Sequence, residues 1–117
     1  LYRDAQGLLH AFVLAENGFA RQWLLPAEGE PRPVRDFAVA PDAEHCRADD
    51  GRDRLYVSEA TGLWRHAAEP EGDDARAPLA LVRPHGPLRQ GGGEIALRAD
   101  GAVAVRDGQV WRRFEAG

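Results

Sequence analysis

Three tryptophans recur along the chain at nearly equal intervals, and each lies in the same local pattern. Trp23 and Trp64 are 41 residues apart, and Trp64 and Trp111 are 47 residues apart. Each tryptophan follows an apolar run and a glycine-containing turn, which predicts a hairpin of two antiparallel strands. A unit that repeats every roughly 40–50 residues is typical of β-propeller blades, each with four short strands. The repeat therefore predicts an all-β fold of antiparallel four-stranded blades that form part of a β-propeller.

The turns and connecting segments agree with a blade repeat. Asn17-Gly18 and Asp107-Gly108 are dipeptides that accept the positive φ angles of tight hairpin turns. Residues 34–39 and 79–82 are further strand candidates, whereas no apolar stripe of helical period is sustained. We expect the tryptophans to fill the core between sheets, as aromatics at equivalent positions of a repeat do. The chain would then hold about two and a half blades, with approximate units at residues 1–30, 31–70 and 76–117.

Composition limits the class of partner. The net charge of -4 argues against a nucleic-acid surface, which needs a clustered basic excess. All 15 cationic side chains are arginines. Coding bias is the favoured explanation of this usage. The usage would also suit oxyanion binding, because a guanidinium binds phosphate through two hydrogen bonds.

Few residues offer metal or redox chemistry of a familiar kind. Cys46 is the sole cysteine, so an internal disulfide and a cysteine metal cluster are both excluded. The four histidines lack the spacings of a tetrahedral metal site. No stretch is long and apolar enough for a transmembrane helix. The chain starts at Leu1 with no signal-like segment, so we expect it to be a piece of a longer protein.

One acid-rich segment lies in the middle of the chain. Glu44, Asp49, Asp50, Asp53 and Glu59 fall within 16 positions, across a turn and the strand after it. Calcium takes six to eight oxygen ligands, which turn carboxylates can supply. An EF-hand spacing is absent, however, and Asp49-Asp50-Gly51 is also favourable turn chemistry. A calcium site and an ordinary acidic turn both remain open at this point.

The same segment carries an ordered series of short motifs. They read Ala48-Asp49-Asp50, Leu55-Tyr56-Val57-Ser58-Glu59, Gly62-Leu63-Trp64-Arg65 and Ala68-Glu69-Pro70-Glu71-Gly72. In this order they resemble the β-propeller phytases, which are calcium-dependent phosphatases that act on inositol hexakisphosphate. The resemblance is good over residues 1–75 and weak beyond them.

The resemblance implies a six-bladed propeller with several calcium ions at one end. It implies Glu44, Glu59 and Glu94 as the metal ligands of this segment, with Asp49 and Asp50 as weaker candidates. The chain departs from the family around these acids. His45 stands where the family has a glycine, and Ala60-Thr61 stands where it has two further acids. The family is usually secreted or periplasmic, and we expect the same compartment here.

Three functional hypotheses follow. The first is that the parent chain hydrolyses phytate or a similar phosphomonoester with calcium, while this segment alone is inactive. The second is a non-catalytic, degenerate propeller domain that binds a phosphorylated small molecule or supports an active phytase domain in the same chain. The third is an unrelated propeller hydrolase of the lactonase type, which would also use a central calcium. The ordered series of phytase-like motifs argues against this third hypothesis.

Overall fold

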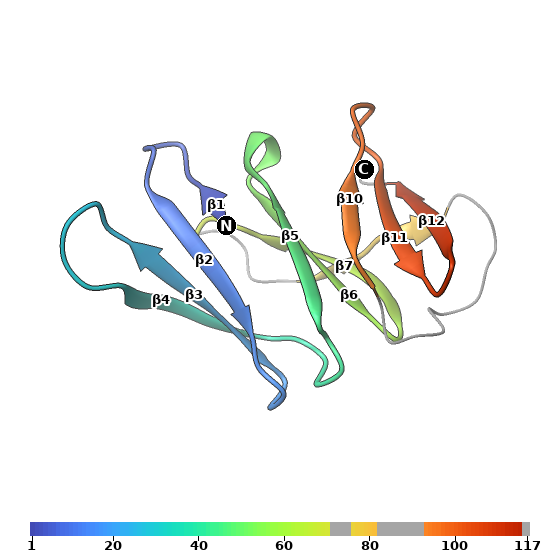
Figure 1. Cartoon of the computed structure of the whole chain (residues 1–117), viewed down its shortest axis with the longest axis horizontal. Coiled ribbons are helices and arrows are strands. Elements are labelled where there is room, and N and C mark those ends of the chain that lie inside the picture. The colour runs from blue at the N-terminus through green and yellow to red at the C-terminus, as the bar shows by residue number, and fades with distance from the viewer. Residues whose placement is uncertain (71–75, 82–92, 116–117) are drawn as a thin grey trace.

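The computed structural model describes residues 1–70, 76–81 and 93–115. Within them the chain forms three four-stranded antiparallel sheets and one short 3₁₀ turn, η1 (Asp50–Arg52). The sheets lie side by side along the longest dimension of the molecule, with the second in the centre (Figure 1). The predicted all-β architecture of antiparallel four-stranded blades is confirmed.

The first sheet is a meander with its strands in chain order. Its strands are β1 (Tyr2–Arg3), β2 (Leu9–Leu14), β3 (Phe19–Leu25) and β4 (Arg32–Ala38). Gly18 ends the loop between β2 and β3 with a φ of 89°, which glycine adopts freely. β4 pairs with β3 from Phe19↔Ala38 to Leu24↔Arg32, so this sheet extends through Ala38. The sheet therefore runs past the approximate unit boundary at residue 30.

The second sheet repeats the meander. Its strands are β5 (His45–Asp49), β6 (Arg54–Glu59), β7 (Gly62–Ala67) and β8 (Ala77–Pro78). A two-residue turn joins β6 to β7, because Glu59 pairs with Gly62 across the ladder. The η1 turn joins β5 to β6 and ends at Asp53, whose φ of 54° is left-handed.

The third sheet has a different order. Its strands are β9 (Ala80–Leu81), β10 (Ile95–Leu97), β11 (Val103–Asp107) and β12 (Val110–Glu115). They are arranged β10-β11-β12-β9, so the strand that comes first in the chain lies at the outer edge. β8 and β9 are separated by Leu79 alone, and the chain thus passes directly from the edge of one sheet to the edge of the next. Residues 80–81 are strand as predicted for 79–82, while residue 82 lies outside the described part.

The tryptophans occupy equivalent strands but not the core. Trp23, Trp64 and Trp111 lie on β3, β7 and β12, which stand third in the strand orders β1-β2-β3-β4, β5-β6-β7-β8 and β10-β11-β12-β9. None of the three is buried, and Trp111 is 45% exposed. The prediction that they fill the core is wrong. On β3 the alternation of side chains buries Ala20, Gln22 and Leu24 instead.

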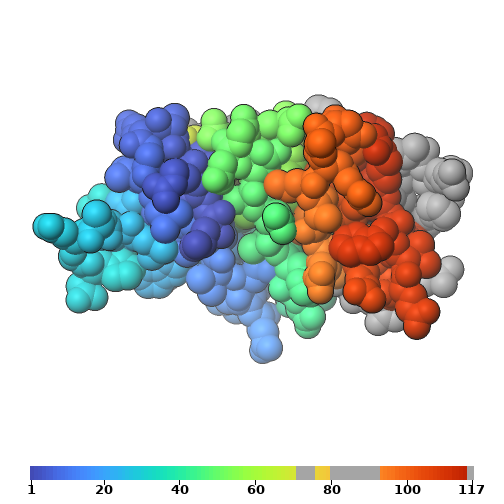
Figure 2. Space-filling view, turned by 45° about the horizontal axis from the view of Figure 1, so that its top comes forward, coloured from blue at the N-terminus to red at the C-terminus, as the bar shows by residue number. Residues whose placement is uncertain are grey.

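The core lies between the sheets. One apolar cluster joins the first and second sheets and comprises Ala20, Phe37, Val39, Ala43, Leu55 and Val57. Another joins the second and third sheets and comprises Tyr56, Leu63, Ile95, Val103, Val105 and Phe114. Alternate residues of β6 enter the two clusters because successive strand side chains point to opposite faces. The space-filling view shows the three sheets packed in succession (Figure 2).

Candidate functional site

The three glutamates expected to bind metal lie at one end of the strands. Glu44 precedes β5 and Glu59 ends β6, and the pairing of His45 with Ser58 places both at the same end of the second sheet. Glu94 precedes β10. Ser58 Oγ donates a hydrogen bond to the carbonyl of Gly93 at 2.8 Å, which brings the start of β10 to this end. We call it the glutamate end.

Glu59 differs from the other two glutamates in its surroundings. It is 1% exposed, whereas Glu44 and Glu94 are exposed to solvent. Its Oε2 accepts a hydrogen bond from the backbone N–H of Ala40 at 3.0 Å. Its Oε1 accepts a hydrogen bond from Arg76 Nη2 at 2.6 Å. Both carboxylate oxygens are therefore engaged within the protein.

The aspartates of the same sequence segment lie at the opposite end of the second sheet. Asp49 pairs with Arg54 at the far end of β5. Its Oδ1 caps η1 by accepting from Gly51 N at 3.1 Å, and its Oδ2 binds Arg52 Nη1 at 3.0 Å. Asp50 accepts a hydrogen bond from the backbone N–H of Arg3 at 3.2 Å. These aspartates thus perform turn and sheet-linking roles, and the fold separates them from the glutamates.

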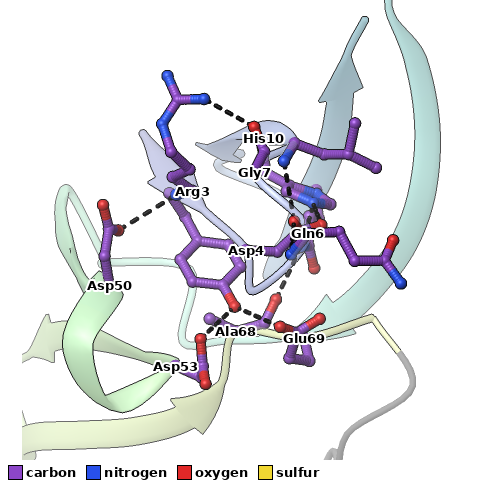
Figure 3. A network of polar contacts seen from close by, with 12 residues as sticks. Arg3, Asp4, Gln6, Gly7, His10, Asp50, Asp53, Ala68 and Glu69 are labelled. Carbon is purple, nitrogen blue, oxygen red and sulfur yellow. Dashed lines mark hydrogen bonds and ion pairs between the residues drawn. The ribbon is translucent and has the colours of Figure 1, made fainter.

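A tyrosine bridges the first two sheets beside these aspartates. The hydroxyl of the fully buried Tyr2 lies 2.7 Å from Asp53 Oδ1 and 2.8 Å from Glu69 Oε1 (Figure 3). Burial raises the pKa of Tyr2 far above its ordinary value, and the hydrogen bonds and negative charges of the two carboxylates add to this effect. The phenol therefore stays protonated and acts as a donor between the sheets.

A second chain of polar contacts runs through the same interface. Gln22 Nε2 donates to the carbonyl of Ala68 at 2.8 Å and lies 3.1 Å from His10 Nδ1. Because the amide nitrogen can only donate, His10 Nδ1 accepts and its Nε2 carries the hydrogen. That nitrogen lies 2.9 Å from Asp4 Oδ2. The hydrogen bond from His10 lowers the pKa of Asp4 below its ordinary value.

Arginines gather around a cavity on the second sheet. Its volume is about 450 Å³, and its lining includes Arg52, Arg54, Arg65 and Arg76 together with His66. His66 is buried, and burial lowers its pKa to about 4, with the charges of Arg76 and Arg35 adding to the effect. Asp53 also lines the cavity, and Arg52 and Arg76 each bind a carboxylate, that of Asp49 and that of Glu59.

Comparison with known families decides the kinship of the chain. A family model described as Phytase matches residues 1–86, which include the first two sheets and β9. The chain belongs to the phytase family. No curated protein matches it at a significant level.

For this phytase-family chain, the acids of the described residues do not assemble a metal centre. No group of three or more His, Cys, Asp or Glu side chains in residues 1–70, 76–81 and 93–115 could hold an ion. Glu59 has donors on both oxygens, and Asp49 and Asp50 lie at the other end of the sheet. These acids alone do not meet the six to eight oxygen ligands of calcium.

Several site residues of the phytase-family chain were not found from sequence. Tyr2, Gln22 and Arg76 belong to no motif of fixed spacing, and their partners are distant in the chain: Tyr2 and Glu69, for example, are 67 positions apart. Glu69 does fall within the Ala-Glu-Pro element that carries the resemblance, so that motif was the available signal.

Among the described residues there is no helix long and apolar enough to span a membrane.

Proposed function

We propose that these sheets are blades of a phytase-type, six-bladed propeller that hydrolyses phosphomonoesters such as phytate in a calcium-dependent manner. The observation that carries the proposal is the family match across residues 1–86. The common location of Glu44 and Glu94 at the glutamate end also supports it, because binding and catalytic residues gather in the loops that a rigid scaffold positions. We assign Glu44 and Glu94 as metal-facing residues, since their side chains are exposed there.

The test is phosphate release from phytate by the full-length protein, with calcium and with a chelator. We expect release that the chelator abolishes. Glu44→Gln and Glu94→Gln should each lower the rate, whereas Glu28→Gln, an exposed glutamate in the turn after β3, should not. Release that is unaffected by the chelator would overturn calcium dependence. Absence of release from a folded protein would overturn the enzymatic function.

A non-catalytic role is the second candidate, and the arginine-lined cavity favours it. Arg54 and Arg65 line a space of about 450 Å³, and guanidinium groups recognise a phosphorylated small molecule through bidentate hydrogen bonds. In this role the domain would bind an inositol phosphate or support an active propeller domain in the same chain. Calorimetric titration with inositol hexakisphosphate tests it, with Arg54→Gln and Arg65→Gln expected to weaken binding and Arg32→Gln expected to leave it unchanged. Equal affinity in all three variants would exclude the cavity as the binding site for inositol hexakisphosphate.

The compartment follows from the same kinship. We propose that the protein is secreted or periplasmic, as members of the phytase family usually are. Fractionation of the producing cells tests this directly. Recovery of the protein in the cytoplasm alone would contradict it.

A further inference from the structure

Glu59 is the only glutamate among the described residues whose side chain is buried. It lies at the end of β6, next to the segment that leads from β4 to β5. The N–H of Ala40 in that segment donates to Oε2, and Arg76 Nη2 donates to Oε1. The hydroxyl of Thr61 lies 3.5 Å from the same Oε1. A buried carboxylate requires a compensating charge, because leaving it unpaired away from water is costly.

Arg76 is held in place from two sides. Its guanidinium lies over the ring of Trp64, with 3.8 Å between the guanidinium carbon and the ring centroid. Its edge meets the Glu59 carboxylate at 2.6 Å. Trp64 is in turn fixed by a hydrogen bond from its Nε1 to Thr61 Oγ1 at 2.9 Å. The face of the cation and its edge therefore have separate partners, which fixes its position at the carboxylate.

We propose that Arg76 is a built-in cation at the glutamate end, and that its guanidinium occupies the position at Glu59 where a metal ion would otherwise bind. Calcium requires oxygen ligands at about 2.3–2.6 Å. To reach Glu59 the ion would displace the guanidinium or the Ala40 N–H, and it would approach a fixed positive charge. Glu59 thus ties the β4–β5 segment to the second sheet and takes no part in calcium binding, whatever the activity of the full-length protein.

A surface pair elsewhere in the chain provides a matched control. Arg21 also lies over a tryptophan, Trp23, at 5.7 Å, and it also binds a carboxylate, Asp36, at 2.8 Å. Both members of this pair are about half exposed, however, with side-chain exposures of 48% for Arg21 and 49% for Asp36. Water therefore screens this pair, and its loss should have little effect on folding.

A double-mutant cycle in the full-length protein tests the ion pair. Arg76→Ala should raise the unfolding constant by about tenfold or more, because Glu59 is left buried without a counter-ion. In a Glu59→Gln background the same substitution should raise it far less. The cycle of Arg21→Ala with Asp36→Asn should show near-additive effects. Additive effects at Arg76 and Glu59 would overturn the proposal.

Calcium provides the second measurement, and it does not depend on catalysis. The change in melting temperature on adding calcium should be the same in Glu59→Gln as in the native protein. Arg76→Ala should gain a calcium-dependent rise, because the ion can now neutralise the vacated carboxylate. If the calcium-dependent rise in melting temperature is lost in Glu59→Gln and unchanged in Arg76→Ala, Glu59 binds the metal. That result would overturn the proposal that Arg76 is a built-in cation.

Discussion

The interface between the first and second sheets is rich in polar contacts, while that between the second and third is built mainly from apolar side chains. The first contains the Tyr2 bridge to Asp53 and Glu69 and the Gln22 hydrogen bond to Ala68. Arg35 adds hydrogen bonds to the carbonyls of the second sheet. The second interface is formed by the apolar cluster that includes Tyr56 and Phe114. The hydrogen bond from Ser58 to the carbonyl of Gly93 lies at the glutamate end of this interface.

This difference separates two ways of fixing one blade against the next. Apolar packing depends on volume and tolerates exchanges between apolar side chains of similar volume. Hydrogen bonds between buried groups do not tolerate such exchanges, since each unmade bond leaves a polar group without water. The first interface is also the one that the phytase family model covers in full, whereas β10, β11 and β12 lie beyond residue 86. We infer that the polar interface specifies the relative placement of the sheets.

The largest expected effect is a loss of stability at acid pH, and it arises at the polar interface. His66 packs on Phe37 across the polar interface, with 4.8 Å between ring centroids, and burial lowers its pKa to about 4. The unfolded chain binds a proton at this residue below about pH 6.5, and the folded protein does not until near pH 4. Stability should therefore be full above pH 6.5 and fall by on the order of 3 kcal/mol as the pH drops toward 4. Urea unfolding across this range measures it.

His66→Phe sharpens the result. The substitution keeps an aromatic ring against Phe37 and removes the titrating group, so the loss of stability between pH 6.5 and 4 should become much smaller. Proton NMR of the native protein should show the His66 ring unprotonated at pH 6. A ring that titrates near pH 6.5 would contradict the cause that we assign.

The next effect concerns Gly93, whose carbonyl accepts the Ser58 hydrogen bond at the end of the apolar interface. A Cβ at Gly93 would lie 2.2 Å from the carbonyl oxygen of Arg106, which is backbone and cannot rotate away. Gly93→Ala should therefore cost roughly 2–3 kcal/mol of unfolding free energy through overpacking. Gly51→Ala is the control, because its nearest neighbour is the Asp49 side chain at 3.6 Å. If both alanine variants unfold at the same urea concentration, the close approach of the Gly93 segment to β11 is not a constraint on the third sheet.

The sequence predicted the strands better than their faces. Asn17-Gly18 and the glycine of Asp107-Gly108 located two hairpins, because tight turns have local chemical requirements. The repeat predicts the tryptophans in the core, whereas none of the three is buried. Period-two alternation divides a strand into two faces but does not say which face is covered, and Arg21 and Arg76 cover two of the tryptophans instead.

The site was less accessible to sequence reasoning. Glu44, Glu59 and Asp49 are close in the sequence, yet β5 runs between them and separates the glutamates from the aspartate. The partner of Glu59 follows 17 positions later, and that of Tyr2 lies 51 positions away in Asp53. Pairings of this kind depend on how sheets pack on one another, which no local spacing encodes.

The third effect tests the tyrosine bridge of the polar interface. Tyr2→Phe removes the hydroxyl between Asp53 and Glu69 and should cost about 1 kcal/mol or somewhat more, since the single phenol hydrogen that these carboxylates share is lost. Tyr56→Phe is its counterpart in the apolar interface. The Tyr56 hydroxyl is buried without a hydrogen-bond partner among the described residues, so its removal should be neutral or slightly stabilising. Equal losses measured by urea unfolding would remove the distinction between the two interfaces.

The smallest effect is expected from the chain of contacts at Asp4. Its pKa is lowered chiefly by the hydrogen bond from His10, and the backbone N–H groups of Leu8 and Gln6 contribute. A carboxyl with a lowered folded pKa adds stability above its ordinary pKa and loses it as the pH falls through the folded value. Asp4→Asn should therefore remove part of the acid sensitivity below about pH 4 and leave the His66 range untouched. Were the Asp4→Asn profile altered only between pH 4 and 6.5, the two titrations would be coupled through the polar interface, and Asp4 and His66 would act as one unit.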